Sequence, residues 1–252
     1  MALATGRSPW SGVVELADDL ELRGPHVTMQ GALISEPASG AVVRLRTLPT
    51  ALYRDVVAFG DEHGLDPIVA LIEGHRAERL PDGIDFIVPH DERLRFAYVT
   101  DLARLADERP IRVFLPTGRE RHQQVRLAAL ERFATRGSVI WSDLTGIEVL
   151  APGTNKGEAV AWLAAREGIS REEIAAVGDA PNDIDLLRVA GRSAAMSPAP
   201  AEVREAADIV VPPSSEDGVL DALAWFFPGL LPDVPLPSRP VGVPLPERAI
   251  PA

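Results

Sequence analysis

An alternation of short apolar runs with helix-length segments in the C-terminal half constrains the fold more than any other feature of the chain. The runs lie at residues 147–151, 174–178 and 209–211, and the segments at residues 156–167, 183–190 and 217–227. Gly168 and Gly191 follow two of the segments, as is common after helix ends. Strands that alternate with helices of this length predict βαβ units. The fold class is therefore α/β with a parallel sheet.

The rest of the chain divides into three parts. Residues 1–34 predict a fragment of the same sheet, with strands at 2–4 and 26–28 and a helix at 9–22. Residues 35–146 follow a different rhythm and have apolar faces for a core of their own, which predicts an inserted α+β domain that begins with a strand at 42–46. Residues 228–252 contain eight prolines and predict a poorly ordered or surface-draped tail. We therefore expect a core made of residues 1–34 and 147–227, a cap of residues 35–146, and a tail.

Charge and composition exclude several classes of function. The formal net charge is −12, so the chain as a whole repels nucleic acid and anionic membranes. There is no cysteine, which removes disulfides and thiolate chemistry. The first ten residues show no secretory signal, and no apolar stretch reaches about 20 residues. We expect a cytoplasmic protein with a small-molecule partner, no nucleic-acid or membrane partner, and an oligomeric state that the sequence leaves open.

The stretch VGDAPNDIDLL, residues 177–187, carries the strongest chemical signal. Asp179 and Asp183, with Asn182 between them, follow an apolar strand and open a helix. In open α/β sheets ligands bind beyond the carboxyl ends of the strands, and carboxylate and amide oxygens suit Mg²⁺. A plain Gly-Asp turn with an aspartate helix cap explains the same letters about equally well.

Two further positions in the sequence are suited to binding an anion. Lys156, the only lysine, opens a helix after the candidate caps Thr154 and Asn155, where a cation is unfavourable unless it faces an anion. Thr5 and Gly6 follow the first strand fragment, so their hydroxyl and amides would point into the same crevice. The letters Thr-Gly-Arg recur at residues 117–119, and we favour the first copy because it lies in the sheet portion.

Other catalytic patterns are missing from the sequence. No G-x-G-x-x-G or Walker loop follows a strand, which disfavours a nucleotide-binding Rossmann protein. The five histidines show no metal-ligand spacing, and we expect surface or cap positions for them. They are His26, His63, His75, His90 and His122.

Several motifs occur together in one order. They are Thr5-Gly6-Arg7, TMQGALI, NKGEAV, GDAPNDIDLL, AAD and SSEDGVLDAL. In this order the chain resembles the Cof-like branch of the haloacid dehalogenase (HAD) superfamily. The resemblance implies a Mg²⁺-dependent phosphatase with a Rossmann-like core and a large inserted cap, acting on a phosphorylated sugar or another small metabolite.

The resemblance also implies a role for each matched residue. Thr5, with Gly6 beside it, would bind the transferring phosphoryl group, and Lys156 would neutralise its charge and hold the nucleophile. Asp179 would ligate Mg²⁺. Asn182 would reach the phosphoryl group, and Asp183 would support the metal's water shell. Gln30 and Ser197 stand where the family often has Asn.

One family motif does not occur in this sequence. The Asp-x-Asp-Gly-Thr loop that supplies the nucleophile and the general acid is missing, and the only Asp-x-Asp is at residues 183–185. We expect an N-terminally truncated phosphatase that lacks its first strand and is inactive. Its neighbouring strands, which end at Thr5 and Gly178, would be left unpaired across an open slot. The alternative is an inactive binding or interaction module of the same fold.

Overall fold

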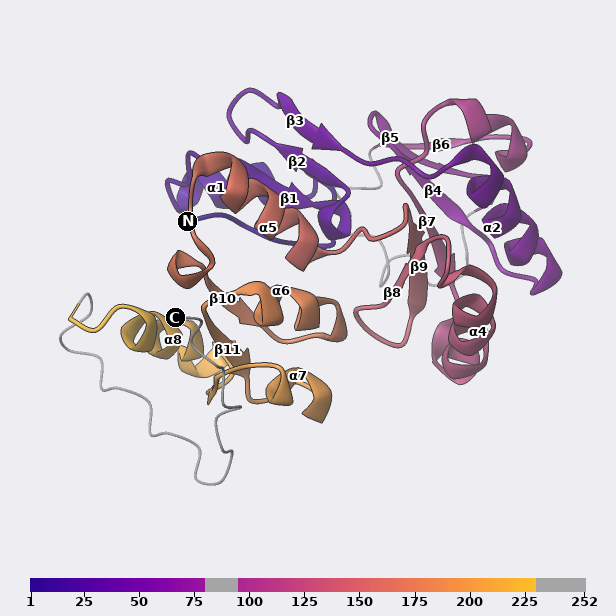
Figure 1. Ribbon diagram of the computed structural model, residues 1–252. Helices are drawn as coiled ribbons and strands as arrows, with labels where there is room; N and C mark the ends of the chain where they lie inside the picture. The colour runs from indigo at the N-terminus through magenta and orange to yellow at the C-terminus, as the bar shows by residue number, and fades with distance from the viewer. Residues whose placement is uncertain (80–94, 230–252) are drawn as a thin grey trace. The chain divides into compact units, whose positions relative to one another are not determined.

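The computed structural model describes residues 1–79 and 95–229 (Figure 1). The chain forms two compact units, Met1–Val160 and Ala161–Ala252, and each is described by itself. Predictions on residues 80–94 and on the tail from residue 230 onward, and the position of His90, lie outside the described residues. None of the helices within the described ranges is both long and apolar enough to cross a membrane.

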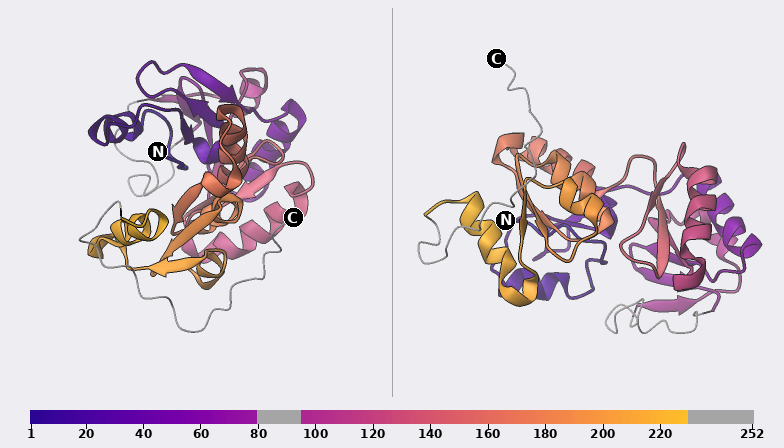
Figure 2. Two further views of the ribbon diagram at one scale, coloured as in Figure 1. Left: turned by 60° about the vertical axis from the view of Figure 1, so that its left-hand side comes forward. Right: turned by 90° about the horizontal axis from the view of Figure 1, so that it is seen from below.

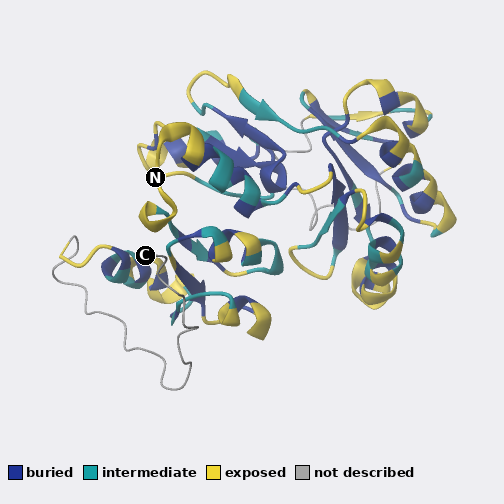
Figure 3. Ribbon diagram, in the orientation of Figure 1, coloured by how far each residue is buried: buried dark blue, intermediate teal, exposed yellow. Residues whose placement is uncertain are grey.

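The first unit is built around a six-stranded mixed sheet. Its order is β6 (Phe96–Tyr98), β5 (Gly74–Ala77), β4 (Ile68–Leu71), β7 (Arg112–Pro116), β9 (Gly146–Leu150) and β8 (Ser138–Ile140). Only β5 and β6 pair in parallel among these strands. The helices α2 (Thr50–Glu62) and α4 (Gly118–Phe133) pack on the sheet, and the 3₁₀ segment η3 (Leu102–Asp107) packs against α2. Tyr53, Phe59 and Phe133 are completely buried in the resulting core, and β4, β7 and β9 are largely dark blue in Figure 3.

A smaller antiparallel sheet in the same unit carries the N-terminal segment. It consists of β1 (His26–Thr28), β2 (Leu33–Ser35) and β3 (Val42–Leu45), with the 3₁₀ turn η1 (Met29–Gly31) between the first two. Ala4 makes a single parallel bridge to Val27, so the expected N-terminal strand is reduced to one bridging residue. The helix expected at residues 9–22 is shorter, α1 (Val13–Asp19), because Gly12 before it is left-handed.

The second unit contains a parallel sheet of β10 (Ala175–Gly178), β11 (Arg192–Met196) and β12 (Ile209–Val211). The helix α5 (Lys156–Glu167) runs from the first unit into the second. The other elements are η4 (Arg171–Glu173), η5 (Pro181–Asp183), α6 (Ile184–Val189), α7 (Ala201–Glu205), η6 (Ser214–Glu216) and α8 (Gly218–Phe226). Figures 1 and 2 show α6 and α8 on opposite sides of these strands. The expected α/β class with a parallel sheet is confirmed.

Two strands were assigned to the wrong sheet by sequence reasoning. The strand expected at residues 147–151 of the parallel core is β9, which pairs antiparallel with β7 and β8. The strand expected at 42–46 in the inserted segment is β3, which pairs with β2. An apolar run predicts a strand but contains no information on which strand it pairs with. The predicted sheet was therefore wrong for both β9 and β3. The domain boundaries at residues 34/35 and 146/147 stay a prediction.

The strands that end at Thr5 and Gly178 are predicted to lie on either side of a missing strand. Within the described residues, each of them pairs with one segment of its own unit. The N-terminal segment pairs with β1. Ala4 forms the parallel bridge with Val27, and the Val27 amide donates a hydrogen bond to the Leu3 carbonyl (2.9 Å). Within the described part of the second unit, β10 pairs only with β11. The open slot between the two strands concerns the placement of the units and stays a prediction.

Candidate functional site

The turn after β10 is a compact, locally bonded structure. The Asp183 carboxylate is 5% exposed, and its Oδ2 accepts hydrogen bonds from the amides of Asp179 (3.0 Å) and Ala180 (3.1 Å). A Cβ at Gly178 would lie 2.5 Å from the Cβ of Asp183, so only glycine fits there. Asp183 therefore braces the turn from inside. Asp179 is exposed at the carboxyl end of the parallel strand.

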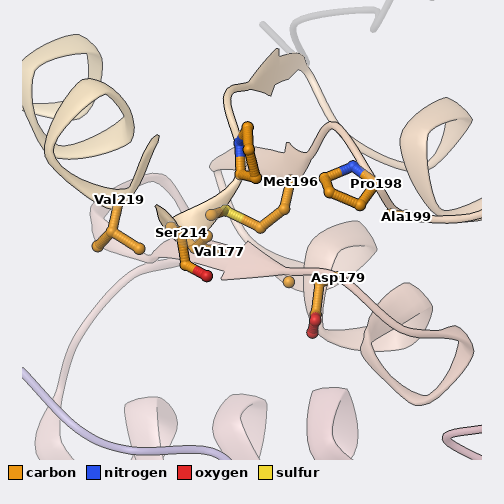
Figure 4. Close-up of a pocket in the computed structure, with 9 residues that line it drawn as sticks. Val177, Asp179, Met196, Pro198, Ala199, Ser214 and Val219 are labelled. Carbon is orange, nitrogen blue, oxygen red and sulfur yellow. The ribbon is translucent and has the colours of Figure 1, made fainter. Parts of the chain in front are cut away.

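A pocket of about 410 Å³ opens at this edge of the parallel sheet (Figure 4). Its lining comprises Val177, Gly178, Asp179, Met196, Pro198, Ala199, Pro213, Ser214 and Val219. Asp179 supplies the one acidic side chain and Ser214 the one hydroxyl among these residues. Ser197, which stands where the family often has Asn, is absent from the lining and donates its amide to the Val211 carbonyl (2.7 Å). The surface of the pocket is therefore mixed polar and apolar, and it includes the Asp179 carboxylate.

The Thr5–Arg7 loop in the first unit is held by its own backbone and by η1. The amides of Gln30 and Met29 donate to the carbonyls of Thr5 (3.1 Å) and Arg7 (2.9 Å). The Arg7 amide donates to the Thr5 hydroxyl (3.1 Å), so this hydroxyl is oriented by the loop itself. Thr5 is half-buried and remains a candidate ligand for an anion.

A buried polar network backs this loop from the six-stranded sheet. Arg112 on β7 donates from Nη1 to the Gly6 carbonyl (2.6 Å) and to Glu148 Oε2 on β9 (2.5 Å). Gln30 donates from Nε2 to Glu148 Oε1 (2.6 Å), and Ser142 Oγ lies 3.3 Å from the same nitrogen. Arg112, Glu148 and Gln30 are 9%, 7% and 1% exposed. Sequence reasoning noted Gln30 only as a departure from the family and missed the other two, since no local motif marks them.

Lys156 lies at the first turn of α5. The Asn155 Oδ1 accepts a hydrogen bond from the Glu158 amide (2.7 Å), which confirms the expectation that Asn155 caps this helix. Lys156 itself is 6% exposed. A Cβ on Gly31 would lie 2.2 Å from the Asn155 carbonyl oxygen, so η1 packs directly on the start of α5.

The structure thus groups the predicted residues in two sets. In the first unit, η1 contacts both the Thr5–Arg7 loop and the segment that leads into Lys156. In the second unit, Asp179, Asn182 and Asp183 share one turn. The structure describes no group of three His, Cys, Asp or Glu residues that could hold a metal ion by itself in residues 1–79 and 95–229.

The histidines differ in part from expectation. His26 is 1% exposed on β1, which lies outside the predicted cap and below the surface, so that expectation was wrong for His26. His75 and His122 are buried within the segment predicted as the cap. Burial lowers the pKa of His122, the nearby Arg126 lowers it further, and Asp143 opposes both. All three residues of β1 are buried, and the His26 ring is buried with them. The spacing of histidines along the chain does not predict such burial.

Comparison with known proteins places the chain in a family. A family model of haloacid dehalogenase-like hydrolases matches residues 1–223. Over 83 residues the chain is 42% identical to a phosphoglycolate phosphatase of Archaeoglobus fulgidus, covering 33% of this chain and 36% of that protein. Over 236 residues it is 26% identical to the chloroplastic endoribonuclease YBEY of Arabidopsis thaliana, covering 88% of this chain and 40% of that protein. The chain therefore spans well under half the length of these two relatives.

Solved structures show the same fold. A HAD subclass IIB sugar phosphatase has a TM-score of 0.78 at 23% identity, covering 89% of this chain and 84% of that one. A haloacid dehalogenase-like hydrolase from Bacteroides thetaiotaomicron has a TM-score of 0.73 at 23% identity, covering 90% and 86%. The family match over most of the chain and the shared fold agree with the order of motifs in the sequence. This chain belongs to the haloacid dehalogenase-like hydrolase family.

Proposed function

We propose that this chain carries the phosphoryl-binding and Mg²⁺-binding parts of a phosphomonoester hydrolase that acts on a small phosphorylated metabolite, a sugar phosphate being the favoured class. The observation that carries the proposal is the turn after β10. There Asp183 braces the backbone and leaves the Asp179 carboxylate exposed at the carboxyl end of a parallel strand. That is where α/β sheets bind ligands.

The residues of the chain suit phosphoryl transfer, which depends mainly on positioning and on neutralising charge on the phosphoryl oxygens. The Thr5 hydroxyl and the amides beside it would donate to those oxygens. Lys156, at the positive end of α5, would add a full charge to the same partner. In the second unit, Asn182 would offer an amide donor to a phosphoryl group. Each of these residues binds or orients, and none of them is a nucleophile.

The donor set of the second unit fits Mg²⁺. This ion is commonly bound through one or two carboxylates together with waters and substrate phosphate oxygens, so a complete protein cage is not required. Asp179 would be the direct ligand, and Asp183 would act through the turn that it braces. When bound, Mg²⁺ would withdraw charge from the phosphoryl oxygens.

The nucleophile must come from an Asp-x-Asp-Gly-Thr segment that the printed sequence does not contain. We therefore propose that the 252-residue chain alone does not turn over phosphate esters by an aspartyl-phosphate route. The alternative is a module that binds an anion and never turns over. The retained Lys156, Asp179, Asn182 and Asp183 favour the hydrolase, because a module freed from catalysis has no need of a metal ligand set.

The relative named an endoribonuclease does not lead us to propose RNA as the substrate. The chain covers 40% of that protein. The formal net charge of −12 also opposes binding to a phosphate backbone. We propose that the chain acts without a nucleic-acid or membrane partner and in the cytoplasm, and we propose no oligomeric state.

Titration of inorganic phosphate into the purified chain, with and without Mg²⁺, tests the binding half of the proposal. We expect saturable phosphate binding that strengthens with Mg²⁺. Lys156→Met should weaken it about 10- to 100-fold, the range expected for losing one charge-assisted hydrogen bond. Arg166→Met, on the last turn of the same helix, is the matched control and should bind as the wild type does. Equal phosphate affinity in both variants would contradict the assignment of Lys156.

Turnover of p-nitrophenyl phosphate tests the catalytic half. The chain as printed should show none. A version with an Asp-x-Asp-Gly-Thr strand–loop–helix segment placed ahead of Thr5 should gain Mg²⁺-dependent turnover. Hydrolysis by the printed chain that both Asp179→Ala and Lys156→Ala abolish would overturn the first expectation. Failure of the extended version to turn over, with phosphate binding intact, would favour the binding module.

A further inference from the structure

We infer that Arg112, Glu148 and Gln30 are positioning residues that orient the Thr5 hydroxyl for a phosphoryl group. This inference rests on the proposed function, because the role of the three residues depends on Thr5 binding a phosphoryl group. Arg112 and Glu148 belong to the six-stranded sheet, more than 100 residues along the chain from the loop that they hold.

Arg112 and Glu148 share one face of two paired strands. On β7 and β9, Arg112 lies opposite Leu150 and Phe114 lies opposite Glu148. Because side chains alternate along a strand, Glu148 and Leu150 point to the same face, and Arg112 joins them there. The guanidinium then bridges the carboxylate to the Gly6 carbonyl through one nitrogen.

The geometry of the peptide between Gly6 and Arg7 transmits this contact. In a trans peptide the carbonyl and the following N–H point in opposite directions, and this chain has no cis peptide in its described parts. With the Gly6 carbonyl directed at Arg112, the Arg7 N–H must point the other way, where it donates to the Thr5 hydroxyl (3.1 Å). Arg112 therefore fixes the orientation of the peptide whose N–H holds the Thr5 hydroxyl within the loop.

Gln30 secures the same loop from a strained turn. Met29, Gln30 and Gly31 have consecutive positive φ values of 48°, 58° and 94°, which is unfavourable for the two residues that are not glycine. A Cβ on Gly6 would lie 2.4 Å from the Gln30 Nε2, so the amide packs directly on the loop. Its bond to Glu148 joins the strained turn to the ion pair. The glutamine, where the family often has Asn, thus has a specific partner here.

Amide hydrogen exchange and phosphate binding on the full chain test the inference together. The amides of Met29 and Gln30 report on the loop, since they bond the carbonyls of Arg7 and Thr5. In Arg112→Met we expect their exchange to rise about tenfold or more, and phosphate affinity to fall about tenfold. Amides in the middle of α4, such as Val125 and Ala129, should change little. Asp55→Asn is the matched control, because Asp55 pairs with Arg132 between α2 and α4 and does not touch the loop.

A double variant separates positioning from stability. Arg112→Met with Glu148→Met removes both charges, so it should recover most of the thermal stability that either single change loses. It lacks the donor to Gly6, so loop exchange should stay fast and phosphate binding weak. If Arg112→Met does not fold, Gln30→Asn replaces it. The shorter side chain should lose the bond to Glu148, and loop exchange and phosphate affinity are then compared in that variant.

Three results would overturn the inference. One is exchange at Met29 and Gln30 that rises no more than exchange in α4. Another is unchanged phosphate affinity despite faster loop exchange. The third is a double variant that regains both stability and phosphate affinity. A wild-type chain that binds no phosphate would instead refute the proposed function, and the exchange data would still decide whether the network holds the loop.

Discussion

Two groups of predicted site residues, one in each unit, are built by different means. The turn after β10 is held by bonds between residues three and four positions apart, from Asp183 to the amides of Ala180 and Asp179. The Thr5–Arg7 loop depends on Arg112, 106 positions from Gly6, and on the link from Gln30 to Glu148, 118 positions apart. The first group is held locally, whereas the second is held by η1 and also from two distant strands.

This difference predicts where each group is vulnerable to substitution. A local turn tolerates changes elsewhere in the chain and fails when its own residues change. A loop held over a long distance also fails when the supporting sheet changes. The following predictions test this contrast, from the largest expected effect to the smallest.

The largest effect should come from the exposed carboxylate of the local turn. In a version of the protein that carries an Asp-x-Asp-Gly-Thr segment, Asp179→Asn should lower kcat/KM by roughly 10²- to 10³-fold and weaken the dependence on Mg²⁺, because the metal would lose its direct ligand. Steady-state kinetics at several Mg²⁺ concentrations measure this. Asp185→Asn, on the exposed side of α6, is the control and should keep near-normal rates. A near-normal rate in Asp179→Asn would refute the metal assignment.

Among glycine substitutions in the two groups, Gly31→Ala should be the most destabilising, and it acts on the first unit. The new Cβ would meet the Asn155 carbonyl oxygen at 2.2 Å, and the residue would keep a φ of 94°. Overpacking and left-handed strain together predict a loss of about 2–4 kcal/mol in the free energy of unfolding. Urea unfolding measures it. Gly168→Ala has a φ of 71° but no atom within 4 Å of the new Cβ, so it should lose only the strain, about 1–2 kcal/mol.

Gly178→Ala should cost about 1–3 kcal/mol in the second unit, because its Cβ would lie 2.5 Å from the Cβ of Asp183. The same change should weaken Mg²⁺ binding, since Asp183 would leave its place in the turn. Urea unfolding and Mg²⁺ titration measure the two effects. The double variant with Asp183→Gly removes the clash, so the two changes should be less than additive. Strict additivity would mean that the turn accommodates the methyl group by another route.

The smallest effect is a pH dependence that His122 contributes in the first unit. Burial first, and then Arg126, lower the pKa of His122 in the folded state, with Asp143 opposing. Between that lowered pKa and the ordinary value near 6.5, the unfolded chain binds more protons, so stability increases with pH. It should fall as the pH is lowered from 7 to 5. In His122→Gln the fall measured by urea unfolding should be smaller, and an identical pH profile would contradict the sign of the shift.

Sequence patterns predicted the local elements well. The helix α5 and the strands β1 and β12 occur at the expected residues, and Asn155 caps α5 as expected. The residue types at positions 178–183 also predicted the turn that the structure shows there. These features depend on contacts within a few positions, which a linear pattern records.

Tertiary structure decided the rest. The strand β11, central in the parallel sheet, was missed because its five residues, with an arginine and a serine, do not form an apolar run. β9 was recognised as a strand and placed in the wrong sheet, although its pairing with β7 is what brings Glu148 to Arg112. Arg112 carries no local signal of its role, because its partner carbonyl belongs to Gly6, 106 positions away. The sequence by itself thus determined the family, the helices and the turn at residues 178–183, because each depends on neighbours along the chain. The bonds from Arg112 to Gly6 and from Gln30 to Glu148 were decided only by packing, because residues so far apart meet only after the sheet has formed.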